Sequence, residues 1–208
     1  MYHIRGINFS ANTTKTLYVA EALGLDYQYT EMNLAGGEHK TPEHLERHPL
    51  GKLPTLEHDG KSLFESNTIC TYLANVTQSP LYPSAPYPRA VVDQWLNFFT
   101  NHLGRWLAAY AFEKYMRGMI GLGEPKVAVL QEAEGFIVEQ LPVVEAQLAK
   151  TSHLAGGAPS VADYIAYAYF ELGVKAEISL ADYPKTAAWF EKLKVSDVVA
   201  RAHTRLER

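Results

Sequence analysis

A cluster of prolines near residue 80 divides the chain into two segments of different texture. Four of the eleven prolines fall within nine residues, at positions 80, 83, 86 and 88. Proline fixes φ and has no backbone N–H, so neither a helix nor a strand continues easily through such a stretch. We therefore predict a linker over residues 79–88, between a first domain at 1–78 and a second at 89–208. A chain of 208 residues is long enough for two small domains with real cores.

The first segment alternates strand and helix signals. The sequence His-Asp-Gly-Lys at 58–61 is typical of a hairpin turn, and Ser66 is a good helix N-cap. The predicted elements are strand 2–7, helix 13–23, strand 27–33, helix 42–47, strands 53–57 and 62–64, and helix 66–76. This β-α-β-α-β-β-α order combines a parallel crossover with a hairpin. It predicts an α/β domain with a mixed four-stranded sheet and helices on its faces.

The second segment is helical throughout. Aromatic residues recur on one stripe between 89 and 117, a loop follows at 118–125, and Pro142 is expected to bend the next helix. The remaining predicted helices are 126–150, 160–172, 184–194 and 197–206. Within the second of these, Ser160 and Asp163 have the spacing of a capping box. The fold class is therefore α/β followed by an all-α helical bundle.

Composition excludes several kinds of partner. The formal net charge is −4 and Lys and Arg form no block, so a nucleic-acid partner is not expected. No apolar run reaches the length of a membrane span, and no signal-peptide pattern opens the chain. The one cysteine, Cys70, excludes an internal disulfide and fits the cytoplasm; we expect it to be buried as a small apolar side chain. His44 and His48 lie four apart without a third ligand, which favours a pair of surface histidines over a metal site.

The turn at residues 8–14, Asn-Phe-Ser-Ala-Asn-Thr-Thr, stands between the first strand and the first helix. Thiol redox proteins carry Cys-x-x-Cys at such a turn, but here the matching residues are Ser10 and Thr13. Two further motifs accompany it, GKLPTLEHDGKSLFES at 51–66 and PSVADY at 159–164. With these motifs the chain resembles the cytosolic glutathione transferases, of a bacterial theta-, beta- or nu-like kind, over essentially its full length. The resemblance implies a thioredoxin-like glutathione-binding domain followed by the helical domain.

The resemblance implies a glutathione site on the first domain. In the family the bond before the equivalent of Pro54 is cis, which leaves the backbone of Leu53 facing outward to pair with the cysteinyl part of glutathione. The helix that begins at Ser66 offers free N–H groups to the γ-glutamyl carboxylate, and Glu65 offers a negative charge to the ligand's ammonium. The alternative for Pro54 is a proline that only begins a strand, and the alternative for Ser66 is a simple helix cap; given the flanking motif we favour the ligand-binding roles.

Basic residues near this site are candidates for the glycyl carboxylate of glutathione. We favour Lys40 and Lys52 over His39, and the alternative for each is a solvated surface charge. For the thiol itself, with an ordinary pKa of about 8.5, a hydroxyl that donates a hydrogen bond favours the nucleophilic thiolate. Several transferase classes use a Ser at the position of Ser10, and some nu-like members use an Asn at that of Asn12. The neighbouring Thr hydroxyls are further candidates, and helix capping is the alternative role of Ser10.

The helical domain is expected to form the electrophile pocket. By the resemblance we assign Arg105, Trp106 and Tyr110 to this pocket, whereas Trp95 and Phe99 are expected in the core. An aromatic stripe at helical spacing is usually core, and this remains the alternative for the first three.

These assignments predict a glutathione S-transferase that joins the glutathione thiolate to small apolar electrophiles. Glutathione is the co-substrate. We expect no metal, and we expect the protein to form a homodimer. Two departures from the family pattern, Asn67 in place of Arg and His48 in place of Asn, concern the usual dimer surface and the turn before Pro49. Two alternatives stay open: a nu-like glutathione-dependent peroxidase or disulfide reductase, and a non-catalytic binding or scaffold protein with the same fold.

Overall fold

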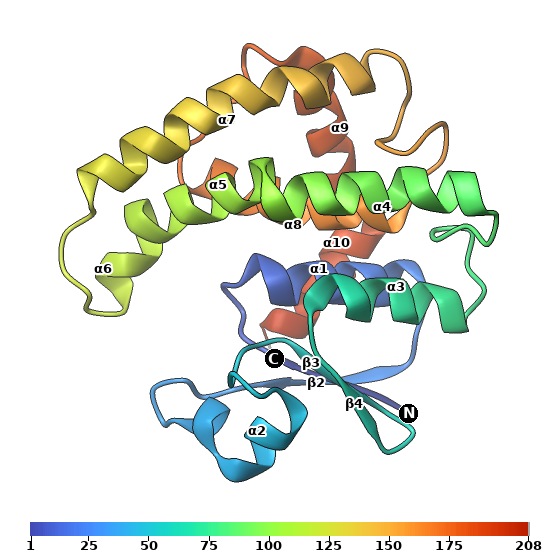
Figure 1. Ribbon diagram of the computed structural model, residues 1–208, viewed down its shortest axis with the longest axis vertical. Coiled ribbons are helices and arrows are strands. Elements are labelled where there is room, and N and C mark those ends of the chain that lie inside the picture. The colour runs from blue at the N-terminus through green and yellow to red at the C-terminus, as the bar shows by residue number, and fades with distance from the viewer. Residues whose placement is uncertain (208) are drawn as a thin grey trace. The chain divides into compact units, whose positions relative to one another are not determined.

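The computed structural model describes residues 1–207 and divides into two compact units. The first comprises Met1–Ser84 together with the segment from Val195 onward, and the second is Ala85–Lys194 (Figure 1). The two units are described separately below.

The first unit is built on a mixed four-stranded sheet, as the sequence predicts. Its strands are β1 (Tyr2–Gly6), β2 (Tyr27–Glu31), β3 (Thr55–His58) and β4 (Lys61–Leu63), in the order β2-β1-β3-β4. Strand β1 runs parallel to β2 and antiparallel to β3, and β3 pairs antiparallel with β4. The β3–β4 turn has φ of 50° at Asp59 and 72° at Gly60, the two positive values that a tight two-residue hairpin requires.

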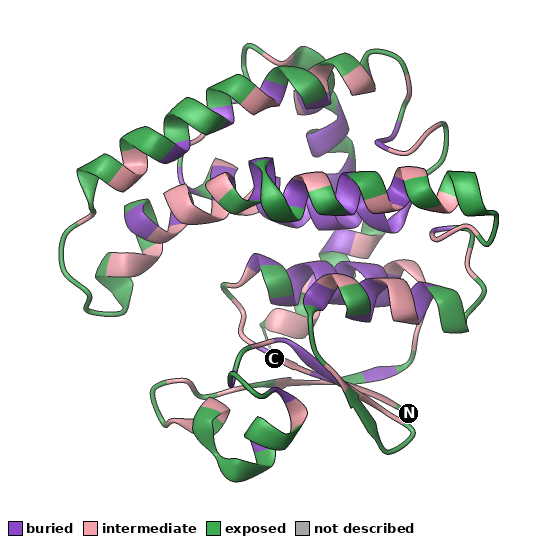
Figure 2. Cartoon of the chain, viewed as in Figure 1, coloured by how far each residue is buried: buried purple, intermediate pink, exposed green. Residues whose placement is uncertain are grey.

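Helix α1 (Ala11–Ala22) is the central helix of the first unit. It packs against α3 (Ser66–Val76) and α10 (Asp197–Leu206). Nearly all of its residues are buried, whereas the short elements η1 (Glu38–Lys40) and α2 (Pro42–Arg47) are mostly exposed (Figure 2). Helices α1 and α3 cover one face of the sheet and α2 lies on the other (Figure 1).

The second unit contains only helices. These are α4 (Pro86–Asn101), α5 (Leu103–Ala111), the π-helical turn η2 (Phe112–Met116), α6 (Arg117–Met119), α7 (Val127–Leu148), α8 (Val161–Lys175) and α9 (Pro184–Lys194). Helix α7 continues through Pro142. The aromatic stripe expected between 89 and 117 does not lie on one continuous helix, because the chain breaks at His102, where φ is −125° and ψ is −109°. Just beyond the break, Gly104 lies so close to the Tyr169 ring that a Cβ would stand 2.7 Å from a ring carbon, so α5 approaches α8 closely.

Helix α8 forms the core of the second unit, and its capping box is confirmed. The side chain of Asp163 is completely buried and accepts hydrogen bonds from the Ser160 N–H (2.9 Å) and hydroxyl (2.9 Å). It also accepts from the N–H of Leu154 (3.0 Å) and the indole of Trp189 (3.1 Å). One carboxylate thus joins the start of α8 to the preceding loop and to α9. The expected core positions of Trp95 and Phe99 are also confirmed.

Candidate functional site

Ser10 precedes the first turn of α1 and caps the helix with its backbone. Its carbonyl accepts from the N–H groups of Thr13 and Thr14, each at 2.9 Å. Among the residues that the structure describes, its hydroxyl makes no capping hydrogen bond. The capping role that competes with a catalytic one is therefore carried by the carbonyl, and the hydroxyl at the start of α1 is left for a ligand.

The two threonine hydroxyls at the same turn are used by the fold. The Thr13 hydroxyl accepts from the N–H of Ile7 at 3.1 Å, and Thr14 donates to the carbonyl of Ala11 at 3.4 Å. Both threonines are buried. Residue 6 is glycine because a Cβ there would collide with the Thr13 side chain. Of the hydroxyls at this turn, that of Ser10 makes no hydrogen bond with any of residues 1–207.

Asn12 and Ser66, which are 54 positions apart in the sequence, meet across the α1–α3 interface. The Ser66 hydroxyl donates to the side-chain oxygen of Asn12 at 3.3 Å. The prediction that Ser66 caps α3 is wrong, because Glu65 is the N-cap and Ser66 is the first helical residue. Its hydroxyl reaches across to α1 instead, and this bond fixes the start of α3 beside the Ser10 turn.

Glu65 has a backbone conformation that is rare for residues other than glycine. Its φ is 67° and its ψ is 106°. Such outliers cost of order 1–3 kcal/mol and cluster at functional sites. Its side chain is exposed, and within residues 1–207 no partner forms a hydrogen bond or ion pair with the carboxylate. The first N–H groups of α3 follow directly, and such groups lack intrahelical partners and suit an anion. A negative side chain thus stands next to a positive helix end.

The loop before β3 presents the backbone of Leu53. The Leu53–Pro54 peptide bond is cis. Among described residues, neither the N–H nor the C=O of Leu53 has a hydrogen-bond partner. The preceding carbonyl, that of Lys52, accepts from Nε2 of His44 at 3.0 Å, so this ring nitrogen carries the proton. The loop is held from the protein side while Leu53 keeps both backbone groups for a ligand.

The two lysines assigned to the site differ in their surroundings. Lys40 Nζ donates to the carbonyl of Leu50 at 3.0 Å and closes over Gly51, which has a φ of 60°. Lys52 extends its exposed side chain from the same loop. Lys40 therefore helps to shape the loop, whereas the charge of Lys52 is exposed to solvent.

His44 and His48 are not a surface pair, and that prediction is wrong. Both are buried: His44 binds the Lys52 carbonyl, and Nδ1 of His48 accepts from the Leu50 N–H at 3.3 Å. The His48 ring also packs against Phe64, with ring centroids 4.8 Å apart. The described part of the chain contains no group of three His, Cys, Asp or Glu side chains that could hold a metal ion.

Sequence reasoning missed Lys15, which lies in the α1–α3 interface. Its exposed fraction is 1%. Burial lowers the pKa of this lysine to about 8, and the nearby Cys70 and Glu65 oppose that shift. The Cys70 thiol contacts the Lys15 carbonyl at 3.7 Å, and burial raises the pKa of that thiol to about 12, so Cys70 is an inert buried thiol as predicted. The sequence alone did not indicate that Lys15 is buried, because lysine is common in the middle of exposed helices.

The residues assigned to the electrophile pocket lie on α5, in the second unit. Arg105 is exposed and its guanidinium lies over the Trp106 ring at 4.8 Å, while Trp106 and Tyr110 are half-buried. The other face of Trp106 stacks on Phe136 of α7, with centroids 4.4 Å apart. Arg105 and Trp106 are therefore in contact. The Trp106 ring also takes part in the packing of α5 against α7.

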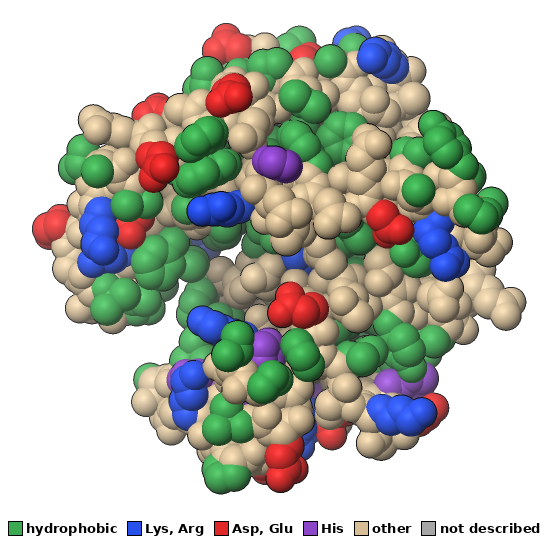
Figure 3. Space-filling view, viewed as in Figure 1, with side chains coloured by type: hydrophobic (Ala, Val, Ile, Leu, Met, Phe, Trp, Pro, Cys, Tyr) green, Lys and Arg blue, Asp and Glu red, His purple; other side chains and the backbone are tan. Residues whose placement is uncertain are grey.

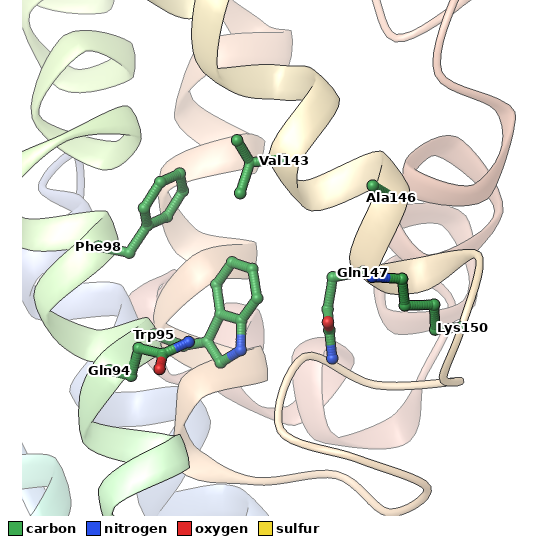
Figure 4. A pocket seen from close by; sticks show the side chains of 7 residues that line it. All are labelled: Gln94, Trp95, Phe98, Val143, Ala146, Gln147 and Lys150. Atoms are coloured by element: carbon green, nitrogen blue, oxygen red, sulfur yellow. The ribbon is translucent and has the colours of Figure 1, made fainter.

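A separate pocket of about 320 Å³ opens between α4 and the C-terminal part of α7 (Figure 4). Its lining is mixed apolar and polar, from Gln94, Trp95, Phe98, Val143, Ala146, Gln147 and Lys150. On the face of the molecule in Figure 3, basic and acidic side chains are interspersed, and neither sign gathers into a patch. Of the helices in residues 1–207, none combines the length and apolar character needed to cross a membrane.

Comparisons with known proteins match both units. The model of the glutathione S-transferase N-terminal domain matches residues 1–75, and that of the C-terminal domain matches residues 92–196. A probable glutathione S-transferase GSTF2 of Oryza sativa subsp. japonica is 33% identical over 191 residues, which are 90% of this chain and 89% of the relative.

Solved structures extend the likeness to the whole fold. The structure of a glutathione S-transferase-I bound with lactoylglutathione has a TM-score of 0.90 at 30% identity, and covers 98% of this chain and 99% of that one. A theta-class enzyme of the citrus canker pathogen Xanthomonas axonopodis pv. citri, with glutathione bound, has a TM-score of 0.88 at 28% identity, covering 97% and 96%. The relatives are mostly plant proteins of the phi class, with bacterial theta-like structures among the neighbours.

Proposed function

The chain belongs to the cytosolic glutathione S-transferase family, and on that premise we propose that it joins the glutathione thiolate to small apolar electrophiles. The sulfur lone pair forms the new carbon–sulfur bond, and the leaving group departs with the bonding pair. The thiol proton goes to solvent. Catalysis then consists of positioning and of stabilising the thiolate.

In this proposal glutathione binds along the first unit. Its γ-glutamyl carboxylate meets the first N–H groups of α3 and its ammonium meets the free carboxylate of Glu65. The cysteinyl backbone pairs with Leu53, before cis-Pro54, in the manner of an added strand. Lys52, with Lys40 beside it, attracts the glycyl carboxylate. Support comes from the backbone groups of Leu53 and the carboxylate of Glu65, none of which has a hydrogen-bond partner within the described part of the chain.

Ser10 stabilises the thiolate in this proposal. The observation that carries it is the hydroxyl at the N-terminus of α1 without a capping bond, beside two threonine hydroxyls that the fold engages. A hydroxyl that donates to sulfur, next to the positive end of a helix, favours the ionised form. Asn12 supports the arrangement by accepting from Ser66. Trp106 and Tyr110 offer partly exposed aromatic surface to an apolar electrophile, and Arg105 a positive charge.

The test compares Ser10→Ala with Ser84→Ala, a control at an exposed serine of the linker. We expect Ser10→Ala to lower kcat/KM with an aryl halide by roughly 10²-fold, since an acid–base contribution has about that size. Calorimetry should show unchanged glutathione binding, and Ser84→Ala should behave as wild type. Binding without conjugation in wild type would favour peroxide or disulfide reduction, and absence of binding would favour a scaffold protein.

We also propose that the chain forms a homodimer. Leu50 exposes 67% of its surface although it is apolar, and the pocket between α4 and α7 is lined in part by Trp95 and Phe98. Removing such exposed apolar surface from water in a contact with a second chain would favour association. Sedimentation equilibrium should give twice the chain mass, and Leu50→Glu should shift it toward the monomer. A wild-type protein that sediments as a monomer at all concentrations would contradict the proposal.

A further inference from the structure

Asn8 is the most fully hydrogen-bonded side chain of the β1–α1 turn, and it lies two residues before Ser10. Its Nδ2 donates to the carbonyl of Leu206 at 2.6 Å and to the carboxylate of Glu31 at 2.9 Å. Its Oδ1 accepts from the hydroxyl of Tyr29 at 2.8 Å. An amide side chain has two N–H groups and one oxygen, and here all of them are used.

The partners of Asn8 come from two other elements of the first unit. Tyr29 and Glu31 lie on β2, which pairs in parallel with β1 through Gly6 and Glu31. Leu206 is the last residue of α10, and the final carbonyls of a helix lack intrahelical partners. Asn8 satisfies one of these carbonyls. The turn is thereby tied to a neighbouring strand and to the end of a helix nearly two hundred residues away in the sequence.

Helix α10 is itself held in place independently of Asn8. The buried carboxylate of Glu21, on α1, accepts from Nε of Arg201 at 3.0 Å and from Nε of Arg205 at 3.3 Å. Tyr27 donates its hydroxyl to the same carboxylate at 2.9 Å. Charge-assisted hydrogen bonds to a buried acceptor are among the stronger ones. The end of α10 is therefore a fixed point to which the turn is attached.

The carbonyl of Ser10 is held firmly by the first turn of α1, but its N–H and its hydroxyl are not. Its N–H reaches the carbonyl of Ile7 at 3.3 Å, which is long, and its hydroxyl makes no capping bond within the described residues. A misplacement of about 1 Å at a reacting centre costs about 10²-fold in rate. The segment just before Ser10 must be held by something else, and Asn8 provides the anchor.

We propose that Asn8 is a positioning residue for Ser10, and that α10 supports the thiolate site from behind through the Asn8–Leu206 contact. The inference rests on the proposed role of Ser10. Asn8 holds the turn so that the Ser10 hydroxyl points to the glutathione sulfur. Glutathione affinity, which depends on α3 and on the loop at Leu53, does not depend on this contact.

The test measures the ionisation of bound glutathione in the full-length protein. The pH profile of kcat/KM with an aryl halide and the ultraviolet absorbance of the bound thiolate are recorded for Asn8→Ala, Tyr29→Phe and Ser10→Ala. For Asn8→Ala we expect the apparent thiol pKa to rise by about one unit, which is a tenfold loss of thiolate below that pKa. Tyr29→Phe, which keeps both donors of Asn8, should shift it less and in the same direction. Glutathione binding by calorimetry should be unchanged.

Matched controls are Asn101→Ala and Tyr87→Phe, both at exposed positions of α4. They should leave the profile as in wild type. If Ser10→Ala moves the profile while Asn8→Ala and Tyr29→Phe only lower thermal stability, the positioning role is overturned and the proposed function stands. If Ser10→Ala leaves the profile unchanged, the role of Ser10 is wrong and the inference about Asn8 falls with it. Should Asn8→Ala fail to fold, Tyr29→Phe alone decides, since a profile identical to wild type contradicts the proposal.

Discussion

The hydroxyl of Ser66 donates to the side-chain oxygen of Asn12 at 3.3 Å, and this bond joins the first turns of α3 and α1. The two helix starts offer different things, an anion site at α3 and the Ser10 hydroxyl at α1. In the proposed function both groups act on one small ligand, so their separation has to be constant. The Asn12–Ser66 bond is a direct constraint on that separation.

Replacing Asn12 should therefore weaken glutathione binding. Asn12→Ala removes the acceptor of the Ser66 hydroxyl, and a typical hydrogen bond contributes about 1 kcal/mol, so we expect a dissociation constant about fivefold higher. Calorimetric titration with glutathione measures this, with Asn101→Ala as the control. A variant that binds as wild type would show that the two helix starts are held together by packing alone.

Glycine at position 65 should separate stability from function. Glycine adopts the φ of 67° at this position without strain, so Glu65→Gly should raise the free energy of unfolding by about 1 kcal/mol. The same substitution removes the carboxylate proposed to bind the ligand's ammonium. The matched control is Asp59→Gly, with a φ of 50° in the β3–β4 turn. Both variants should melt a few degrees higher, and only Glu65→Gly should lose glutathione affinity. Equal affinity in the two variants would contradict the assignment of Glu65.

Removing the Asp163 carboxylate should destabilise the helical unit without touching the chemistry. Asp163→Ala leaves three buried donors without an acceptor: the N–H groups of Leu154 and Ser160 and the indole of Trp189. Each unsatisfied group lowers the stability by about 1–3 kcal/mol. We expect a loss of at least about 3 kcal/mol in denaturant unfolding, against almost none for Asp182→Ala at an exposed position. Unchanged stability in Asp163→Ala would mean that water replaces the carboxylate.

Local sequence patterns predicted most of the fold. The bounds of α2, α3, α9 and α10 agree with the structure to the residue, and the sheet is four-stranded and mixed, with the predicted parallel crossover and hairpin. These elements carry their own signals: caps, breaker residues and hydrophobic period. The family, expected from three motifs, is confirmed by the comparisons. The break at His102 was missed because neither proline nor any other local breaker marks it; the close approach of Gly104 to Tyr169 just beyond it is visible only in the structure.

The missed features of the site have the same origin. Asn8 contacts Leu206 and Asn12 contacts Ser66, over separations that no local pattern reports. The packing of α10 on α1 depends on Glu21 and its two arginine partners, which look like ordinary surface charges in the sequence. Lys15 likewise occupies a mid-helix position where lysine is common. Long-range contacts of polar residues thus had to be seen in the structure.

The buried Lys15 should make the stability of the protein depend on pH in an unusual direction. Burial lowers its pKa from the ordinary 10.5 to about 8, so between these values the unfolded chain binds one more proton than the folded chain. The free energy of unfolding is therefore highest, as far as this group is concerned, above about pH 10.5. It decreases as the pH falls toward 8. In that window the wild type should gain up to about 1.4 kcal/mol per pH unit relative to Lys15→Met.

Urea unfolding of wild type and Lys15→Met across that window measures the difference, and the comparison removes the contribution of all other groups. Lys192→Met, at an exposed position of α9, serves as the control and should run parallel to wild type. A difference between wild type and Lys15→Met that stays constant from neutral pH upward would mean that Lys15 titrates as it does in the unfolded chain. Since 99% of the residue's surface is removed from solvent, such a result would require that its neighbours, Cys70 and Glu65 among them, offset the effect of burial in full.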